Sequence, residues 1–228
     1  ADLFPFLGES KDEHADELNG ESSEALRNVT VLAVGGSDAA AFIFRFWEDE
    51  YKKKELDVDF EYQPAAESVG SKWVLDSRLD LALVSSLSDQ LLSPKLVYTP
   101  LAADAVVFAV NKSVTGVSDL SSEQLLAIYK GETTNWQEVG GPNRSVVLLD
   151  REESDSGKQL FRQIYLESEP VSRKAVEIHS ESDMLKALEI TVNSIGYFSY
   201  ARAQASDQIR ILELDHAGPE GDYKMKIG

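Results

Sequence analysis

The stretch 146-VVLLDREESDSGKQLF-161 decides the fold that we predict for this chain. Its apolar start, residues 146–149, predicts a buried strand. Residues 159–166 predict a helix with Leu160, Phe161 and Ile164 on one face. The strand and the helix are joined by a polar turn, so this stretch is typical of a sheet covered by helices.

The polar turn carries Arg151 and the pair Ser156-Gly157. A Ser-Gly pair at a helix start leaves free backbone N–H groups at the positive end of the helix dipole. An arginine beside them can grip two oxygens of one anion, so the turn is a candidate anion site. An ordinary Ser N-cap with Arg151 paired to Glu152 or Glu153 explains the same residues.

The composition excludes several kinds of partner and several kinds of chemistry for this chain. A chain of 228 residues, 43% of them hydrophobic, can bury a core in one large domain or two lobes. The net charge of −18 argues against nucleic acid and anionic membranes as partners. The absence of cysteine excludes disulfides, thiol catalysis and cysteine-ligated metal sites. We also expect no membrane helix, because no apolar run approaches the roughly 20 residues that one needs.

The first residues predict a peripheral segment. Residues 1–27 are polar and acidic, which is typical of a flexible arm. We expect no signal peptide within the sequence, because it starts without a basic region followed by an apolar one. A start at Ala1 is typical of an exported protein after cleavage, or of a shortened chain.

The next part alternates strands and helices. We expect strands at 29–34, 56–62 and 80–84 and helices at 39–52 and 71–77, a pattern typical of a parallel sheet covered by helices. Small hydroxyl residues follow all three strands: Ser37, Ser68, and Ser85 with Ser86. Ligands of open α/β sheets bind at the carboxyl ends of strands, so these turns predict a shared polyol or oxyanion pocket.

The second half continues the pattern. We expect strands at 105–110, 194–200 and 209–214 and a helix at 180–190. In the helix that ends near residue 130, Ser121 and Gln124 form a capping box and Gly131 a C-cap. Three tryptophans beside helices predict packing residues rather than ligand contacts: Trp47, Trp73 and Trp136.

Several motifs resemble one family. The block from Asp119 through Tyr129-Lys130-Gly131 to Thr134-Asn135-Trp136, followed by Ile195-Gly196-Tyr197, resembles the substrate-binding proteins of phosphate ABC transporters (the PstS type). The resemblance runs from about residue 30 to 223. It implies a two-lobed α/β fold, the type II periplasmic-binding-protein fold, with lobe 1 at 28–101 plus 201–228 and lobe 2 at 102–200.

The resemblance also implies the ligand-binding residues. The family's first oxyanion donors correspond here to Ser37 with the backbone of Asp38 and Ala39. A second set corresponds to Ser68 with Val69 and Gly70. The remaining predicted donors lie in the arginine turn: Arg151, Ser156, Gly157 and Lys158. Tyr197 is predicted to face the cleft.

The sequence departs from the family pattern at acidic and basic positions. In the family, an aspartate accepts the proton of hydrogen phosphate, and this chain has Ser85 at that position. Where the family has a threonine after Ser-Gly, this chain has Lys158. Asp38 and Glu67 add carboxylates, which either replace that acceptor or repel a dianion.

We therefore expect an extracytoplasmic solute-binding protein that clamps phosphate or a related oxyanion for ABC-type uptake. We expect a monomer with a permease partner, no cofactor and no nucleic acid. The alternative is a domain reused as a sensor or interaction module with altered or lost ligand binding. An enzyme is not expected, because His14, His179 and His216 have no nucleophile pattern nearby and read as surface residues.

Overall fold

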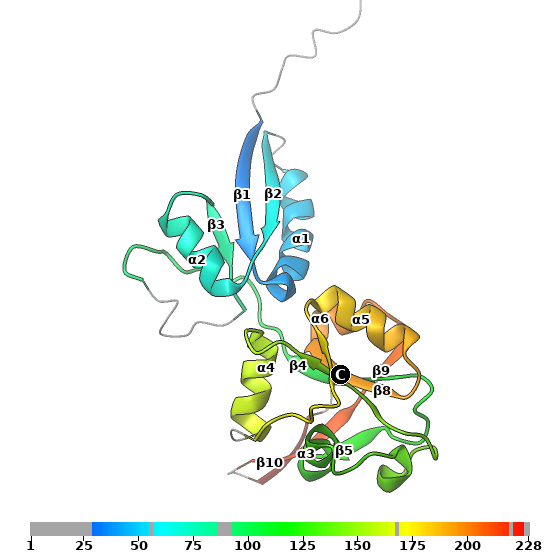
Figure 1. Cartoon of the computed structure of the whole chain (residues 1–228). Helices are drawn as coiled ribbons and strands as arrows, with labels where there is room; N and C mark the ends of the chain where they lie inside the picture. The colour runs from blue at the N-terminus through cyan, green and yellow to red at the C-terminus, as the bar shows by residue number, and fades with distance from the viewer. Residues whose placement is uncertain (1–28, 55–56, 86–92, 167–168, 219–220, 226–228) are drawn as a thin grey trace, which may run out of the picture.

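The computed structural model describes residues 29–54, 57–85, 93–166, 169–218 and 221–225, which form two lobes (Figure 1). The first lobe, residues 29–85, holds a three-stranded parallel sheet of order β2-β1-β3. Its strands are β1 (Thr30–Gly36), β2 (Val58–Pro64) and β3 (Leu81–Leu83). Helices α1 (Asp38–Lys52) and α2 (Glu67–Leu75) follow β1 and β2.

The second lobe, from residue 105 onward, is built on a five-stranded sheet of order β7-β6-β8-β4-β9. Its strands are β4 (Val106–Asn111), β6 (Val147–Arg151), β7 (Val176–Ile178), β8 (Ser194–Ser199) and β9 (Ile209–Ile211). Strand β6 runs parallel to β7 and β8, whereas β4 is antiparallel to β8 and β9. The predicted α/β class with mainly parallel sheets is confirmed.

Shorter elements complete the second lobe. The helices are α3 (Ser122–Lys130), α4 (Ser156–Phe161), α5 (Glu181–Ile190), α6 (Tyr200–Ala203), the 3-10 turn η1 (Trp136–Val139) and the π-helical turn η2 (Arg162–Leu166). A small sheet of order β11-β10-β5 is also present. Its strands are β5 (Asp119–Ser121), β10 (Glu213–Gly218) and β11 (Gly221–Met225). The predicted capping box and the Gly131 cap of α3 are both confirmed. No helix in the described part of the chain is long and apolar enough to span a membrane.

The structure corrects two predicted elements. The helix predicted from residue 159 begins at Ser156, and its N-cap is Asp155 rather than a serine. Phe161 is buried in it, but Leu160 and Ile164 are exposed. The single strand predicted at 209–214 is two strands, because Leu212 is buried where the chain leaves one sheet for another.

The described residues beyond position 200 lie with the second lobe. The resemblance places 201–228 in lobe 1, but β9 pairs with β4, and β10 pairs with β5 and β11. Ile209 and Leu212 are buried in the second-lobe cores, which fixes this placement. Within the described residues, the chain therefore passes between the lobes once, along residues 93–104. The predicted acidic arm lies outside the described residues.

The two lobes differ in the size of their buried hydrophobic cores. The main core of the second lobe contains fifteen buried hydrophobic residues, with Trp136, Tyr129 and Phe161 among the largest. Trp136 also donates its indole N–H to the Asn193 carbonyl. In the described part of the first lobe, the buried cluster consists of Val34, Ala41 and Leu83. Trp47, predicted to pack, is 53% exposed on α1.

Candidate functional site at the lobe junction

The first lobe presents a serine pair at the ends of two neighbouring strands. Ser37 follows β1 and caps α1, and its hydroxyl lies 2.5 Å from the hydroxyl of Ser85, which follows β3. The backbone N–H of Ser37 donates to Leu83, which joins the two strand ends. The predicted meeting of these two turns is confirmed, and it sets two hydroxyls beside the start of a 15-residue helix.

Two glycines let this turn close. Gly36 has a φ of 127°, and a Cβ there would lie 2.2 Å from the Leu83 carbonyl oxygen. Gly70 of α2 packs on it, since a Cβ on Gly70 would lie 3.1 Å from the Gly36 Cα. Only residues without a side chain allow this approach. The predicted donor Ser68 lies in the first turn of α2, and Ala39 lies in the first turn of α1.

The second lobe presents a buried arginine. Arg151 ends β6 with 3% of its surface exposed, and its Nη2 donates to Asp155 at 2.6 Å. Its Nε and Nη1 are buried and have no hydrogen-bond partner among the residues that the structure describes. The partner is Asp155 rather than Glu152 or Glu153, because Asp155 is the N-cap of α4 and lies four residues beyond the arginine. The arginine turn thus keeps two unused donor nitrogens.

Lys158 does not face a cleft. Its side chain is buried, and the ammonium group donates to Asp150 at 2.7 Å and to the Arg151 carbonyl at 2.9 Å. Glu153 lies 2.9 Å away as a third acceptor. Burial alone lowers the pKa of Lys158, but the bonds with Asp150 and Glu153 outweigh it and leave the pKa raised. The three ammonium hydrogens are matched within the protein, whereas Ser156 and Gly157 start α4 and are half-buried.

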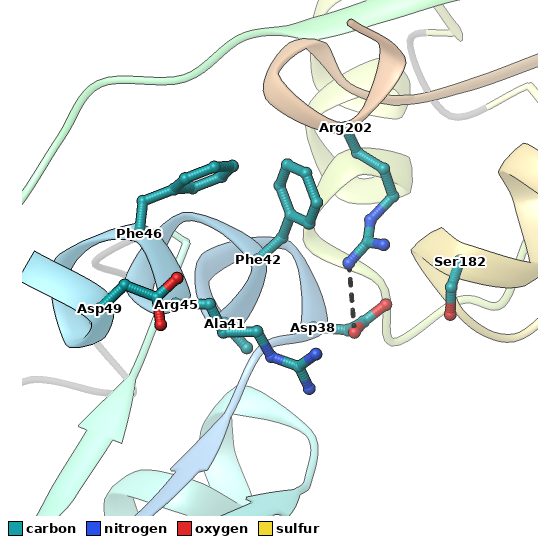
Figure 2. A pocket seen from close by; sticks show the side chains of 8 residues that line it. All are labelled: Asp38, Ala41, Phe42, Arg45, Phe46, Asp49, Ser182 and Arg202. Carbon is teal, nitrogen blue, oxygen red and sulfur yellow. Dashed lines mark ion pairs between the residues drawn. The ribbon is translucent and has the colours of Figure 1, made fainter. Parts of the chain in front are cut away.

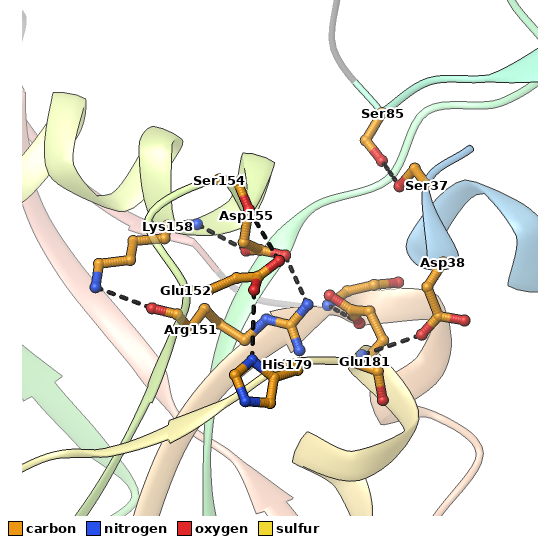
Figure 3. A network of polar contacts seen from close by, with 12 residues as sticks. Ser37, Asp38, Ser85, Arg151, Glu152, Ser154, Asp155, Lys158, His179 and Glu181 are labelled. Atoms are coloured by element: carbon orange, nitrogen blue, oxygen red, sulfur yellow. Dashed lines mark hydrogen bonds and ion pairs between the residues drawn. The ribbon is translucent and has the colours of Figure 1, made fainter. Parts of the chain in front are cut away.

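A third group comes from the start of α5. Glu181 is 4% exposed, and its Oε2 accepts the backbone N–H of Ser199 at 2.9 Å. Burial raises the pKa of Glu181 to about 7, against the opposing effects of the Ser199 N–H and the Arg151 charge. Figure 3 shows the Glu181 and Arg151 side chains next to one another, with Asp38 on the far side of Glu181.

Asp38 connects the lobes. One carboxylate oxygen accepts the backbone N–H of Glu181 at 3.0 Å, and the other lies 3.5 Å from Nη2 of Arg202 on α6. The Arg202 guanidinium also covers the Phe42 ring at 4.4 Å, a cation–π contact across the junction. A cavity of about 370 Å³ opens beside these contacts (Figure 2). Its walls are Asp38, Ala41, Phe42, Arg45, Phe46, Asp49, Ser182 and Arg202.

The junction is acidic despite its two arginines. Asp38, Asp155 and Glu181 stand against Arg151 and Arg202. With every group ionised, three negative charges oppose two positive ones. In the described part of the chain, no three His, Cys, Asp or Glu side chains are grouped to hold a metal ion. The arrangement can therefore bind an anion at Arg151 only if the carboxylates accommodate its charge.

Sequence reasoning missed Asp155, Glu181 and Arg202. An acid in the first turn of a helix normally stabilises the helix dipole at the surface, so nothing in the sequence marks Glu181 as buried. Tyr197, expected to face the cleft, is fully buried and donates its hydroxyl to Asp150 at 2.6 Å. The expectation for His179 is confirmed, since its side chain is 74% exposed.

Comparisons with known proteins agree with this architecture. The model of a PBP superfamily domain matches residues 20–223. The phosphate-binding protein PstS of Bacillus subtilis is 24% identical over 217 residues, which cover 93% of this chain and 70% of that protein.

Solved structures share the fold. A putative phosphate ABC transporter substrate-binding protein from Clostridium perfringens, solved with bound phosphate, superposes with a TM-score of 0.73 at 23% identity. The match covers 84% of this chain and 79% of that one. The regulatory domain of CcmR from Synechocystis, in complex with 2-PG, superposes with a TM-score of 0.60 at 14% identity and covers 84% of each chain. The chain therefore belongs to the PBP superfamily, and it is similar to PstS-type phosphate-binding proteins.

Proposed function

We propose that this chain binds a tetrahedral oxyanion, phosphate first, between its lobes and serves ABC-type uptake as a solute-binding protein. The observation that carries the proposal is Arg151, which is buried and has two of its three guanidinium nitrogens unpartnered within the described part of the chain. A buried N–H without a partner costs about 1–3 kcal/mol, and more for a charged group. An oxyanion between the lobes supplies the missing acceptors.

The first lobe adds complementary groups. The hydroxyls of Ser37 and Ser85 each donate and accept, and they lie at the start of α1, where the helix dipole favours negative charge. The contacts of Asp38 with the second lobe show that the two lobes approach closely at this point. Closure of two lobes on a small ion excludes water and strengthens each hydrogen bond.

The names of relatives support phosphate as the ligand. The Bacillus subtilis relative is a phosphate-binding protein, and the Clostridium perfringens structure contains phosphate. The net charge of −18 does not oppose binding, because short-range hydrogen bonds set affinity while the overall field mainly changes the association rate.

Calorimetric titration of phosphate into the purified chain tests the proposal. We expect binding that Arg151→Ala weakens by about 100-fold or more, because a charged hydrogen-bonding group is lost. Arg144→Ala is the matched control, since Arg144 is exposed and its hydrogen bonds with described residues lie within 135–144. Absence of binding by the folded chain contradicts the proposal, as does equal weakening by both substitutions.

A second candidate function is a sensor or interaction module with altered ligand binding. The acidic junction favours it, because Asp38, Asp155 and Glu181 oppose a dianion. The likeness to the CcmR regulatory domain shows that this fold also occurs in a regulator. A panel of oxyanions and carboxylates in thermal-shift assays separates the two. No rise in melting temperature with phosphate, but a rise with another anion, favours the sensor.

Location and partners complete the proposal. We infer that the chain acts outside the cytoplasm, as a monomer, and that a permease receives its ligand, with no nucleic-acid partner and no catalytic activity. The resemblance to solute-binding proteins supports each of these. Light scattering on the purified chain tests the monomer, and capture of the permease from detergent-solubilised membranes, with and without phosphate, tests the partner.

A further inference from the structure

The cavity beside the contact of Asp38 with Arg202 is not explained by the proposed oxyanion site. Its volume is about 370 Å³, at the lower end of the roughly 300–1,000 Å³ that is usual for small-molecule sites. Arg151, Ser37 and Ser85 do not line it. The lining residues come from α1 of the first lobe and from α5 and α6 of the second, so a molecule in the cavity contacts both lobes (Figure 2).

Two phenylalanine rings form the apolar wall of the cavity. Phe42 and Phe46 lie one helical turn apart on α1, with ring centroids 5.4 Å apart and ring planes at 86°. Figure 2 shows both rings on the same side of the helix. Phe46 is 62% exposed, and an apolar group that covers its ring is stabilised by the removal of this surface from water. The wall therefore favours an organic ligand over an inorganic ion.

Arg202 lies at one end of this wall and has unused hydrogen-bond donors. Its side chain is only 13% exposed, and its guanidinium covers the Phe42 ring at 4.4 Å. Its one ion pair among the described residues, with Asp38, spans 3.5 Å, which is longer than the about 2.8 Å of a charge-assisted hydrogen bond. Its Nε is buried without a partner in the described part of the chain. A carboxylate matches the planar guanidinium with two oxygens and supplies the missing acceptors.

The other charged side chains of the lining limit the charge of the ligand. Asp38 already accepts the Glu181 N–H and faces Arg202. Farther along α1, Arg45 and Asp49 are exposed, one turn apart and opposite in sign. Two aspartates and two arginines give the lining no net charge, so it does not attract a dianion as a whole. A ligand with one negative charge at Arg202 is the better match.

We propose that this cavity is a second binding site, separate from the oxyanion site at Arg151, for small organic monocarboxylates with an aromatic ring. The carboxylate pairs with the guanidinium of Arg202. The ring packs against Phe42 and Phe46. The inference does not rest on the proposed phosphate function, because Arg151 takes no part in it.

Titration of benzoate into the purified chain, followed by NMR of the ligand, tests the site. We expect benzoate to bind at least about tenfold more tightly than acetate, which has the same carboxylate without the ring. It should exceed benzamide by a similar factor, because benzamide has the ring without the charge. Equal affinity for benzoate and either of these compounds contradicts the proposal.

Two pairs of variants locate the binding. Phe46→Ala should weaken benzoate binding about tenfold, because apolar contact is lost. Trp47→Ala is its control, since Trp47 is an exposed aromatic residue of the same helix that does not line the cavity. Arg202→Gln should weaken binding about tenfold or more, whereas Arg173→Gln, at an exposed arginine outside the cavity, should not change it. Circular dichroism verifies that each variant is folded.

Phosphate separates the two sites. Benzoate should bind with unchanged affinity in saturating phosphate and in Arg151→Ala, the substitution that is expected to weaken phosphate binding. Displacement of benzoate by phosphate, or loss of benzoate binding in Arg151→Ala, places both ligands in one site and overturns the proposal. Equal effects of Phe46→Ala and Trp47→Ala, or no benzoate binding by the folded chain, also overturn it and leave the phosphate function intact. Failure of phosphate alone to bind overturns only the proposed function.

Discussion

The carboxylate of Asp38, in the first lobe, accepts the backbone N–H of Glu181, in the second lobe, at 3.0 Å. The two residues begin helices α1 and α5, so the first residue of one helix bonds the first residue of the other. An N–H at a helix start is a preferred site for an anion. Asp38 therefore provides, from within the chain, the kind of group that an external ligand would bring.

Asp38 also pairs with Arg202, which in turn covers Phe42. These contacts hold the lobes together through a carboxylate that belongs to the protein. An oxyanion that enters the junction must either add to this carboxylate or displace it. Asp38 is thus a repelling charge as well as a link between lobes.

The first prediction concerns this double role. Asp38→Asn removes the charge while it keeps an oxygen for the Glu181 N–H. We expect phosphate to bind about tenfold more tightly, because one carboxylate no longer opposes it. Calorimetric titration measures the change, and Glu50→Gln, an exposed acid on the same helix that does not line the cavity, is the control. Weaker binding by Asp38→Asn instead means that Asp38 acts as an acceptor for the ligand, the role that the sequence suggests.

The second prediction concerns Lys158. Its ammonium group is buried against Asp150, so Lys158→Met leaves a carboxylate without its cation. We expect a loss of about 3–5 kcal/mol in the free energy of unfolding, the usual effect of breaking a buried pair. Urea denaturation measures it, with the exposed Lys186→Met as the control. A loss below that of the control means that the pair is not buried in solution.

Local patterns predicted most of the fold. The capping box of α3, the Gly131 cap and the alternation of strands with helices depend on neighbours in the chain, and all are found in the structure. The end of the chain was misplaced because burial of Ile209 and Leu212 depends on contacts with β4, which lies about a hundred residues earlier.

The site was less predictable for the same reason. The meeting of Ser37 and Ser85 follows from the rule that parallel strands share one edge, and it was predicted. The pairing of Arg151 with Asp155 was not, because Glu152 and Glu153 in the same turn were the partners that the sequence suggested. Glu181 and Arg202 join the junction from distant helices, and no sequence motif connects them to Arg151.

The third prediction follows from the unequal cores. Three buried hydrophobic residues form the first-lobe cluster, against fifteen in the main second-lobe cluster. The free energy of the opening that exposes the amides of β1 and β2 should therefore be at least about 2 kcal/mol lower than that for β4 and β8. Hydrogen exchange followed by mass spectrometry measures both regions in one sample. Equal protection in the two lobes contradicts the prediction and indicates that the lobes unfold together.

The fourth prediction concerns stability and pH. The pKa of Glu181 is raised from 4.5 to about 7 in the folded chain, chiefly by burial. Between these values the folded state binds more protons than the unfolded state, so stability falls as pH rises. The effect is complete above pH 7 and amounts to about 3 kcal/mol, since each unit of pKa shift corresponds to about 1.4 kcal/mol.

Glu181→Gln should remove this pH-dependent loss, because a glutamine amide does not ionise. Relative to the unmodified chain, the variant should gain about 3 kcal/mol in the free energy of unfolding between pH 4 and pH 8. Urea denaturation gives the free energy of unfolding of the variant relative to the unmodified chain at each pH. The gain is the change of this relative value from pH 4 to pH 8, so an effect of the substitution on packing that does not depend on pH cancels. Glu177→Gln should show no such gain, because Glu177 is exposed. An equal response of both variants to pH means that Glu181 ionises freely, and the junction then holds its third negative charge at neutral pH.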